Sequence, residues 1–424
     1  MKLINIPSSE FNTRTQHLPC LNWHQTANWA ELKANTGWHA HYLAYEDEDQ
    51  IVAAVMILSK NIPFSKKQLF YAPRGFLIDF NNDELLRNFH KEVINYIKNN
   101  HGFELMIDPY LEYQHRDIDG NIVDDGFNNQ SVVNTLLDLG YHHNNGFNLY
   151  NENLQPRWIY ELDLSAKPYN QLLKDFRPEV RRRAKKKDFY SITVREIGRD
   201  EIHLYKEVMG HTANRRGFID RPLSYYEHMY DCLNKDGMLR YFIAEIDFAK
   251  SLANLSEEVN KSEAKLAELE AKENKFTKIL NEIKEENIRL ASLKKNLAII
   301  EEYSTKAKNN TVLSGVTLLT YGNEAVQLLA GNYEDFELFA SSTILVSELI
   351  KIIKEEGYSI YNFYGITGDF DEKNPLNGLY VFKKGFGGHV VELIGEFEYV
   401  IDKPTKLIYE LGLKVYSLLK KIRH

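Results

Sequence analysis

Four turns at the ends of expected strands carry residues that could bind anions or move protons. Arg74 lies between a proline and a glycine, and Asp108 stands directly before a proline. Tyr364 and Lys383 lie in glycine-rich segments of the last quarter of the chain. Because loops at strand ends are where α/β folds bind ligands, these side chains are candidates for one site. Taken singly, each is also explained as a turn, a capping carboxylate or a solvated lysine.

Familiar catalytic and nucleotide-binding motifs are absent from the sequence. It contains no Gly-x-x-x-x-Gly-Lys-Ser/Thr, no Gly-x-Gly-x-x-Gly, no Gly-x-Ser-x-Gly and no His-Glu-x-x-His. The two cysteines, Cys20 and Cys232, are too few for a disulfide framework, and the histidine pairs lack a third ligand nearby. We therefore predict no metal centre.

The formal net charge of −8 over 424 residues argues against a wholly basic nucleic-acid binder, so any basic surface must be local. The segment 177–187 is the strongest local exception. Its positive residues are Arg177, Arg181, Arg182, Arg183, Lys185, Lys186 and Lys187. Charge runs are usually only solvated, but this density favours a polyanion, either RNA phosphates or anionic lipid.

Hydrophobic patterning predicts an α/β (α+β) fold with similar units in both halves of the chain. Amphipathic helices are expected at 84–99 and 336–356, the second ending at Gly357. Strands are expected at 38–45, 51–58, 68–71, 103–107, 239–246, 312–321, 325–329 and 360–364. The strand–helix–strand order recurs on both sides of the middle, which indicates tandem domains.

A heptad pattern fills the segment between two of these strands. Apolar residues recur at spacings of three and four from Phe248 to Leu269, and again from Phe276 to Ile300, with Lys and Glu elsewhere. No Gly or Pro occurs from 238 to 314. Because the register breaks once near the middle, we expect an antiparallel helical hairpin rather than one long dimeric coiled coil.

Together these features resemble the FemABX family of tRNA-dependent aminoacyltransferases, which build peptidoglycan bridges. The helical insert favours the FemA/FemB (and MurM/MurN-like) branch, whose members carry such an arm. The matching pieces, in chain order, are 73–75, 107–114, 155–157, 177–187, 218–221, Tyr225-Tyr226, the insert, 361–370, 382–386 and 395–397. They span nearly the whole chain.

The resemblance implies tandem acetyltransferase-like (GNAT) domains with an inserted antiparallel coiled-coil hairpin. Residues 1–154 would form the first domain, and 155–247 with 306–400 the second. The arm would comprise 248–305, and 401–424 a C-terminal amphipathic helix.

The resemblance also implies a reaction, in which an amine attacks the ester carbonyl of aminoacyl-tRNA. The amine belongs to the stem-peptide lysine of lipid II or to a bridge started on it, and the amino acid moved is Gly, Ala or Ser. Lys383 could supply positive charge where the oxyanion develops. Asp108 could accept the amine's proton, orient the ammonium group, or simply cap a turn. No cofactor is expected beyond aminoacyl-tRNA as co-substrate.

Further residues fall where the family binds its substrates. Lys33, Arg74 and Arg221 match positions of muropeptide and phosphate contacts, for which Arg suits bidentate binding. Tyr364 and Phe382 would line the groove or pack in the core. The basic residues Arg181, Arg182, Arg183, Lys185, Lys186 and Lys187 would bind tRNA or anionic lipid.

The C-terminal segment predicts a helix with one apolar stripe and a basic polar side. It could lie on an anionic membrane near a lipid-linked substrate, or pack against the first domain. The start of the chain lacks a signal-peptide core, and the longest apolar run, 51–58, is too short to span a bilayer. We expect a cytoplasmic protein, at the inner face of the cell membrane if this helix binds lipid. Both a monomer and a homodimer are compatible with the arm.

Two other functions fit parts of the pattern. An acetyl-CoA-dependent N-acetyltransferase would share the fold, but its Arg/Gln-x-x-Gly-x-Gly/Ala turn for the CoA pyrophosphate is absent. A noncatalytic scaffold built on the arm would not need the ordered series of strand-end motifs.

Overall fold

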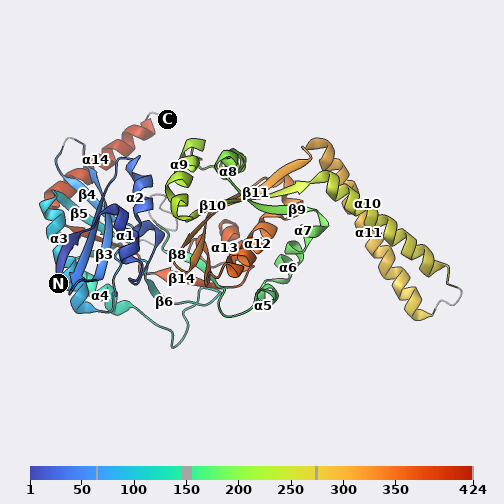
Figure 1. Ribbon diagram of the computed structural model, residues 1–424, viewed down its shortest axis with the longest axis horizontal. Coiled ribbons are helices and arrows are strands. Elements are labelled where there is room, and N and C mark those ends of the chain that lie inside the picture. Colours follow the sequence, from blue (N-terminus) through green and yellow to red (C-terminus); the bar gives the residue numbers. More distant parts are fainter. Residues whose placement is uncertain (64, 145–154, 273–275, 423–424) are drawn as a thin grey trace.

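A computed structural model of the chain describes residues 1–63, 65–144, 155–272 and 276–422. In these residues two β-sheets lie next to each other, and a helical arm projects from the second (Figure 1).

The first sheet contains one parallel pair of strands among antiparallel neighbours. Within the described residues its order is β1 (Lys2–Asn5), β2 (His39–Asp47), β3 (Gln50–Asn61), β4 (Gln68–Ala72), β5 (Gly102–Ile107), β15 (Glu396–Val400) and β7 (His142–Asn144). The parallel pair is β4 and β5, which α3 (Asp83–Asn99) connects. Leu86, Phe89, Val93 and Ile97 recur at spacings of three and four on α3 and are fully buried, so its apolar face packs into the core.

The second sheet repeats this plan. In the described part of the chain its order is β6 (Glu112–His115), β14 (His389–Leu393), β8 (Trp158–Asp163), β13 (Ile360–Gly365), β12 (Glu324–Asn332), β11 (Asn310–Tyr321), β10 (Leu239–Asp247) and β9 (Ile192–Ile197). Here β12 and β13 are the parallel pair, and α12 (Ser341–Glu355) connects them. The strands expected from alternation are all present, and Gly322-Asn323 form the hairpin turn between β11 and β12.

Shorter helices surround the sheets. Beside the first lie α1 (Ser8–Thr15), η1 (Trp23–Gln25), α2 (Ala27–Ala34) and α4 (Gln130–Asp138). The second is accompanied by α5 (Tyr169–Asp175), α6 (Pro178–Ala184), α7 (Lys186–Phe189), η2 (Arg199–Glu201), α8 (Ile202–Arg216), α9 (Leu223–Leu233), η3 (Asn234–Asp236), η4 (Glu334–Phe339), η5 (Pro375–Asn377) and α13 (Gly378–Lys384).

The two sheets exchange strands and share a core. β6 precedes residue 154 but joins the second sheet, whereas β15 comes late in the chain and joins the first. One apolar cluster contains Trp23 and Met56 from the first half together with Leu239 and Val326 from the second. The predicted division at 154/155 stays a prediction, and residues 145–154 lie outside the described part. The shared core means that the sheets are held firmly against each other.

Two predicted elements differ in the structure. The helix expected over 336–356 begins only at Ser341, because Ala340 has a left-handed backbone (φ 55°) and η4 precedes it. Phe339 is buried there against Tyr303 of the arm, which fixes this break. The segment expected as a glycine-rich turn at 378–388 instead begins with helix α13.

The arm is an antiparallel hairpin of α10 (Phe248–Glu270) and α11 (Thr277–Lys306), as predicted (Figure 1). Leu255 and Val259 of α10 and Leu293 of α11 are buried in its seam. Glu286, also buried, accepts hydrogen bonds from Ser262 and Lys265 across the hairpin. The apolar seam is therefore covered within one chain.

The chain ends in α14 (Lys403–Ile422), the amphipathic helix expected there; residues 423 and 424 lie outside the described part. Lys406 pairs with Glu104 and Glu398, and the Tyr409 ring lies 5.3 Å from that of Phe103, so the first turns are anchored on the first sheet. Beyond them the described side chains are exposed. Among the described residues, no helix combines the length and hydropathy needed to cross a bilayer.

The root of the arm should contribute strongly to stability. Ile300 is 0% exposed, whereas Leu280 near the tip is 51% exposed. Ile300→Ala should lower the free energy of unfolding by about 2–5 kcal/mol, because it leaves a cavity in the core. Leu280→Ala is the matched control and should change it by less than about 0.5 kcal/mol. Urea titration followed by circular dichroism measures both; equal losses would contradict the burial of this seam.

Candidate functional site

The ends of β4 and β5 are tied together by Asp108. Its Oδ1 accepts the backbone N–H of Arg74 at 2.7 Å, and its Oδ2 accepts the Tyr71 hydroxyl at 2.9 Å. Arg74 has a left-handed backbone (φ 56°), which turns the chain sharply after the strand. Asp108 is 4% exposed, and burial raises its pKa. Of the roles considered for Asp108, capping is the one whose contacts are present.

The Arg74 side chain reaches from the first sheet to the second. Its Nη2 donates to the carbonyl oxygen of Pro156 at 2.7 Å, and its guanidinium carbon lies 5.9 Å from the centre of the Tyr110 ring. Arg74 is only 3% exposed. A buried guanidinium at this junction places positive charge between the domains.

A pair of carboxylates faces this junction from the second sheet. The Tyr110 hydroxyl lies 2.7 Å from Glu324 Oε1 and 3.2 Å from Glu161 Oε1, and Asn362 Nδ2 donates to Glu161 at 3.1 Å. Burial raises the pKa of both carboxyls, and the charge of Glu324 raises that of Glu161 further. Such a pair retains a proton more readily than separate carboxyls do. Sequence reasoning missed it, because each glutamate lies in an ordinary strand.

Lys383 lies in the last turn of α13 and is 3% exposed, not in an open turn. Its Nζ donates to the carbonyl oxygens of Tyr364 and Gly365, at 3.1 and 2.6 Å. Burial lowers its pKa to about 7, since the charged amine loses hydration. Two carbonyls use two of the three donors of an ammonium group, which leaves one for a ligand.

Tyr364 connects this lysine to the junction. Its backbone is left-handed (φ 65°), and its hydroxyl donates to Gln155 Oε1 at 2.7 Å. Burial raises its pKa to about 12, and the charges of Arg74 and Asp108 act on it in opposite directions. The structure therefore gathers Arg74, Asp108, Tyr364 and Lys383, four of the residues predicted to form the site. Phe382 is half-buried and packs against the Phe386 ring at 5.2 Å.

Glu396 is a further acidic group of this site that was not assigned a role from sequence. It begins β15, the strand beside β5, and its Oε1 accepts a hydrogen bond from Asn144. Its Oε2 is buried without a partner among the described residues. Burial raises its pKa, and the charge of Asp108 raises it further. Its proximity depends on a strand contributed from the far end of the chain.

Beside the junction lies a group of cations, Lys33, Lys60 and Arg221, which we call the cation cluster. Each stands over an aromatic ring: Lys33 over Trp29 at 4.5 Å, Lys60 over Trp38 at 5.4 Å, and Arg221 over Tyr225 at 5.5 Å. Burial lowers the pKa of Lys33, and the charges of Arg221 and Lys60 lower it further. In the described ranges none of the three forms an ion pair with a carboxylate. Uncompensated cations at this density suit a phosphate group.

His24 links the cation cluster to the junction. It is buried, its Nδ1 lies 2.7 Å from Asn22 Oδ1, and its side chain hydrogen-bonds to Gln155. Burial and the charges of Arg74 and Lys33 hold its pKa well below the usual value. A neutral histidine therefore separates the two positive groups.

Comparison with known proteins agrees with this geometry. The FemAB family matches residues 6–415 of the chain. The chain belongs to the FemAB family. The resemblance predicted from sequence is thereby confirmed.

Relatives of the FemAB chain align over its whole length. The lipid II:glycine glycyltransferase of Staphylococcus aureus (strain MRSA252) is 28% identical over 432 residues, covering 100% of this chain and 98% of that protein. The crystal structure of FemX superposes with a TM-score of 0.80 at 26% identity, covering 96% of this chain and 99% of that one. The predicted fold class, tandem GNAT-like domains, is confirmed.

The basic stretch of this FemAB protein forms two short helices, α6 and α7, beside the helix that carries Lys383. Arg177 donates its backbone N–H to Gly385 at 2.9 Å, just after α13. Three of the cations are neutralised, in the pairs Arg177–Glu372, Arg183–Glu179 and Lys187–Glu348. Arg182 and Lys185 are exposed and form no ion pair within the described residues.

The capping role of Asp108 makes a prediction about stability. Asp108→Ala leaves the Arg74 N–H without its acceptor and should lower the free energy of unfolding by about 1–3 kcal/mol. Asp108→Asn keeps an acceptor oxygen and should cost less. Urea titration of both variants measures the difference.

The pH dependence of stability in the same variants tests whether burial raises the pKa of Asp108. Because the folded pKa of Asp108 is raised, the native state binds its proton more tightly than the unfolded chain does. Wild-type stability should therefore fall as pH rises from the pKa that Asp108 has in the unfolded chain to the higher pKa that it has in the folded protein. Asp108→Asn should remove that contribution. A fall of the same size in Asp108→Asn would contradict this assignment.

Proposed function

We propose that this chain transfers an amino acid from aminoacyl-tRNA to an amine on lipid II, and so builds peptidoglycan interpeptide bridges. The amine is the stem-peptide lysine or the end of a bridge already started. One observation carries the proposal: a buried lysine amine with a free donor stands beside a junction that holds the buried Arg74 and near an uncompensated cation cluster. The full-length likeness to lipid II:glycine glycyltransferases supports it and favours glycine as the amino acid.

In this reaction the amine nitrogen attacks the ester carbonyl carbon, and an oxyanion develops on the carbonyl oxygen. The C–O bond to the ribose then breaks, the amine loses a proton, and the ribose hydroxyl gains one. Charged Lys383 donates its third N–H to the oxyanion, and its donors to Tyr364 and Gly365 hold it in place. A buried amine that needs no reorganisation stabilises such a charge well.

Acidic groups of the junction receive the acceptor amine. Asp108 acts through Arg74 as a positioning residue, since both of its oxygens already accept hydrogen bonds. The Glu161–Glu324 pair and Glu396 provide carboxylates with raised pKa, which suits them to attract an ammonium group and take up its proton.

The cations divide between the two substrates. Lys33, Lys60 and Arg221 bind the pyrophosphate of the lipid-linked acceptor, where their lack of carboxylate partners leaves their donors available. Arg182 and Lys185, exposed beside α13, contact the tRNA backbone. The enzyme works in the cytoplasm at the inner face of the membrane that holds its acceptor. A monomer suffices, because the arm's seam is covered within the chain.

The proposal is tested by transfer of radiolabelled Gly, Ala or Ser from charged tRNA to lysine-containing lipid II, with and without ribonuclease. We expect ribonuclease-sensitive transfer of glycine. Lys383→Met should lower kcat about 100- to 1000-fold, as loss of an oxyanion donor does, with little change in KM. The neighbouring Lys384, which pairs with Glu372 at 2.5 Å, provides the matched control Lys384→Met, and thermal melts verify that both variants fold.

The pH profile adds a second readout. Because Lys383 acts in its charged form and its pKa is about 7, wild-type kcat should fall as pH rises through that value. Residual activity of Lys383→Met should lack this limb. Transfer that survives Lys383→Met unchanged would remove the lysine from the mechanism. No transfer to lipid II, plain or already branched, would overturn the function.

The assignment of tRNA to the basic helices is tested by salt dependence. Arg182→Ala/Lys185→Ala should weaken binding of charged tRNA and reduce the slope of log affinity against log salt by about one to two, because up to two phosphate contacts are lost. Lys278→Ala/Lys284→Ala on the exposed face of the arm is the matched control. If the arm variant instead loses affinity and slope, the arm rather than α6 and α7 binds tRNA. Affinities follow from filter binding over a salt series.

A further inference from the structure

Among the described residues, exposed large apolar side chains are most concentrated on α14. Successive residues of a helix are about 100° apart around its axis, so one group of apolar side chains falls within a sector of roughly 120°. These residues, which we call the α14 stripe, are Leu407, Ile408, Leu411, Val415, Leu418 and Leu419. They are 53–71% exposed, although large apolar side chains of soluble domains seldom gather in the open. Such a patch marks a surface of interaction.

The charge of this segment indicates what covers it. Residues 403–424 contain six Lys or Arg and one Glu, a net charge of +5 (6 − 1) in a chain whose total is −8. An apolar stripe beside basic residues suits the boundary between headgroups and acyl chains of an anionic bilayer. With 20 residues α14 is long enough, but it is too polar to cross the bilayer, so it would lie in the surface.

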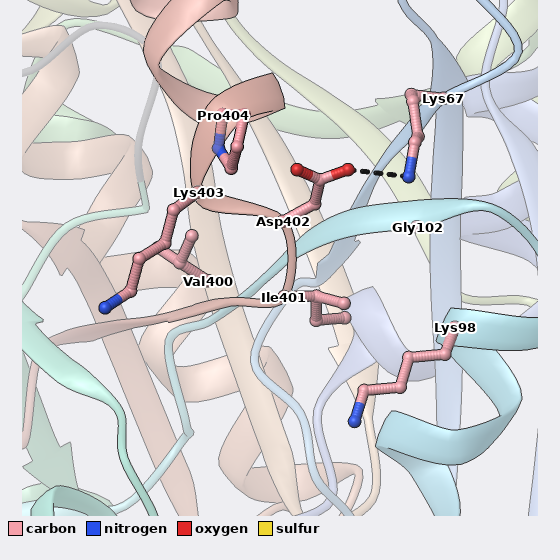
Figure 2. A pocket seen from close by; sticks show the side chains of 8 residues that line it. All are labelled: Lys67, Lys98, Gly102, Val400, Ile401, Asp402, Lys403 and Pro404. Carbon is pink, nitrogen blue, oxygen red and sulfur yellow. Dashed lines mark ion pairs between the residues drawn. The ribbon is translucent and has the colours of Figure 1, made fainter.

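Basic residues of the protein body continue the positive charge to the start of the helix. A cavity of about 590 Å³ opens where α14 leaves the first sheet, lined in part by Lys67, Lys98 and Lys403 (Figure 2). Lys67 pairs with Asp402 at 2.7 Å, whereas Lys98 and Lys403 are exposed and direct their amines away from that pair (Figure 2). This cavity lies at the N-terminal ends of β4 and β5, whereas Arg74 and Asp108 follow the C-terminal ends of these strands.

The position of α14 in the fold allows one edge of the molecule to face a bilayer. In Figure 1, α14 runs along the same edge at which α2 and α9 stand. The last turn of α2 carries Lys33, and Arg221 lies just before α9, so the cation cluster belongs to that edge. Ile219, in the turn between α8 and α9, is 93% exposed. The helix that carries the stripe, the turn of this isoleucine and the elements of Lys33 and Arg221 therefore belong to one edge in this view.

We propose that the α14 stripe docks this protein on an anionic lipid bilayer, with its side chains inserted at the level of the headgroups. The proposed reaction supplies a reason for such docking, because its acceptor is lipid-linked. Docking itself needs no substrate and can be measured without one.

The experiment is cosedimentation of the full chain with sucrose-loaded vesicles of equal parts phosphatidylglycerol and phosphatidylcholine, beside vesicles of phosphatidylcholine alone. Wild type should bind the anionic vesicles, more weakly at high salt. Leu411→Gln/Leu418→Gln removes two stripe side chains without changing charge and should lower the bound fraction about tenfold at subsaturating lipid. All of these positions are exposed, so folding should be unaffected.

The matched control is Leu413→Gln/Tyr416→Gln, which replaces two exposed apolar residues on the other side of the same helix. It should bind as wild type does. Absence of vesicle binding, or equal loss in both variants, would overturn the proposal. So would light scattering that shows a dimer abolished by the stripe substitutions alone, since the occupant would then be a second copy. A chain that binds vesicles but transfers nothing would refute the proposed reaction and leave this docking intact.

Discussion

The bond from the Arg74 backbone to Asp108 is the contact on which the junction between the sheets depends. It joins the ends of the two parallel strands of the first sheet and fixes the left-handed turn from which the Arg74 side chain leaves. That side chain then reaches Pro156, two residues before β8 of the second sheet begins. A buried acceptor for one N–H thus determines where a guanidinium stands between two domains.

The electrostatic balance of the junction follows from this placement. Arg74 is surrounded by buried acidic groups with raised pKa, so part of its charge is compensated inside the fold. The cation cluster, by contrast, has aromatic rings beneath it and no carboxylate partner among the described residues. Rings hold cations in place without neutralising them. One set of charges therefore stabilises the structure, while the other remains available to an anionic ligand.

Sequence patterns predicted the arm and the strands β2–β5 and β10–β13, because period-two alternation and heptad spacing are local properties; the shorter strands β1, β6–β9, β14 and β15 were not predicted. They failed where a distant segment decides the outcome. The glycines around Lys383 indicated a turn, but α13 packs against the second sheet and buries the lysine. Ala340 breaks a helix whose periodicity was continuous, since Phe339 is held by the arm. Glu161 and Glu324 meet only because β8 and β12 both flank β13, and no local spacing encodes that order.

The position of the site between the two ends of the molecule fits a reaction with two bulky substrates. In the proposed reaction an ester on tRNA and an amine on a lipid meet at one carbon, and the two bulky carriers must approach it from different directions. Helices α6 and α7 lie on the side of the second sheet near the arm (Figure 1), and Arg177 before α6 bonds to Gly385 just after the helix of Lys383. Helix α14 leaves the first sheet at the opposite end of the molecule (Figure 1). Because a shared core holds the two sheets together, the proposed membrane contact at one end and the proposed tRNA contact at the other keep fixed positions relative to the same junction.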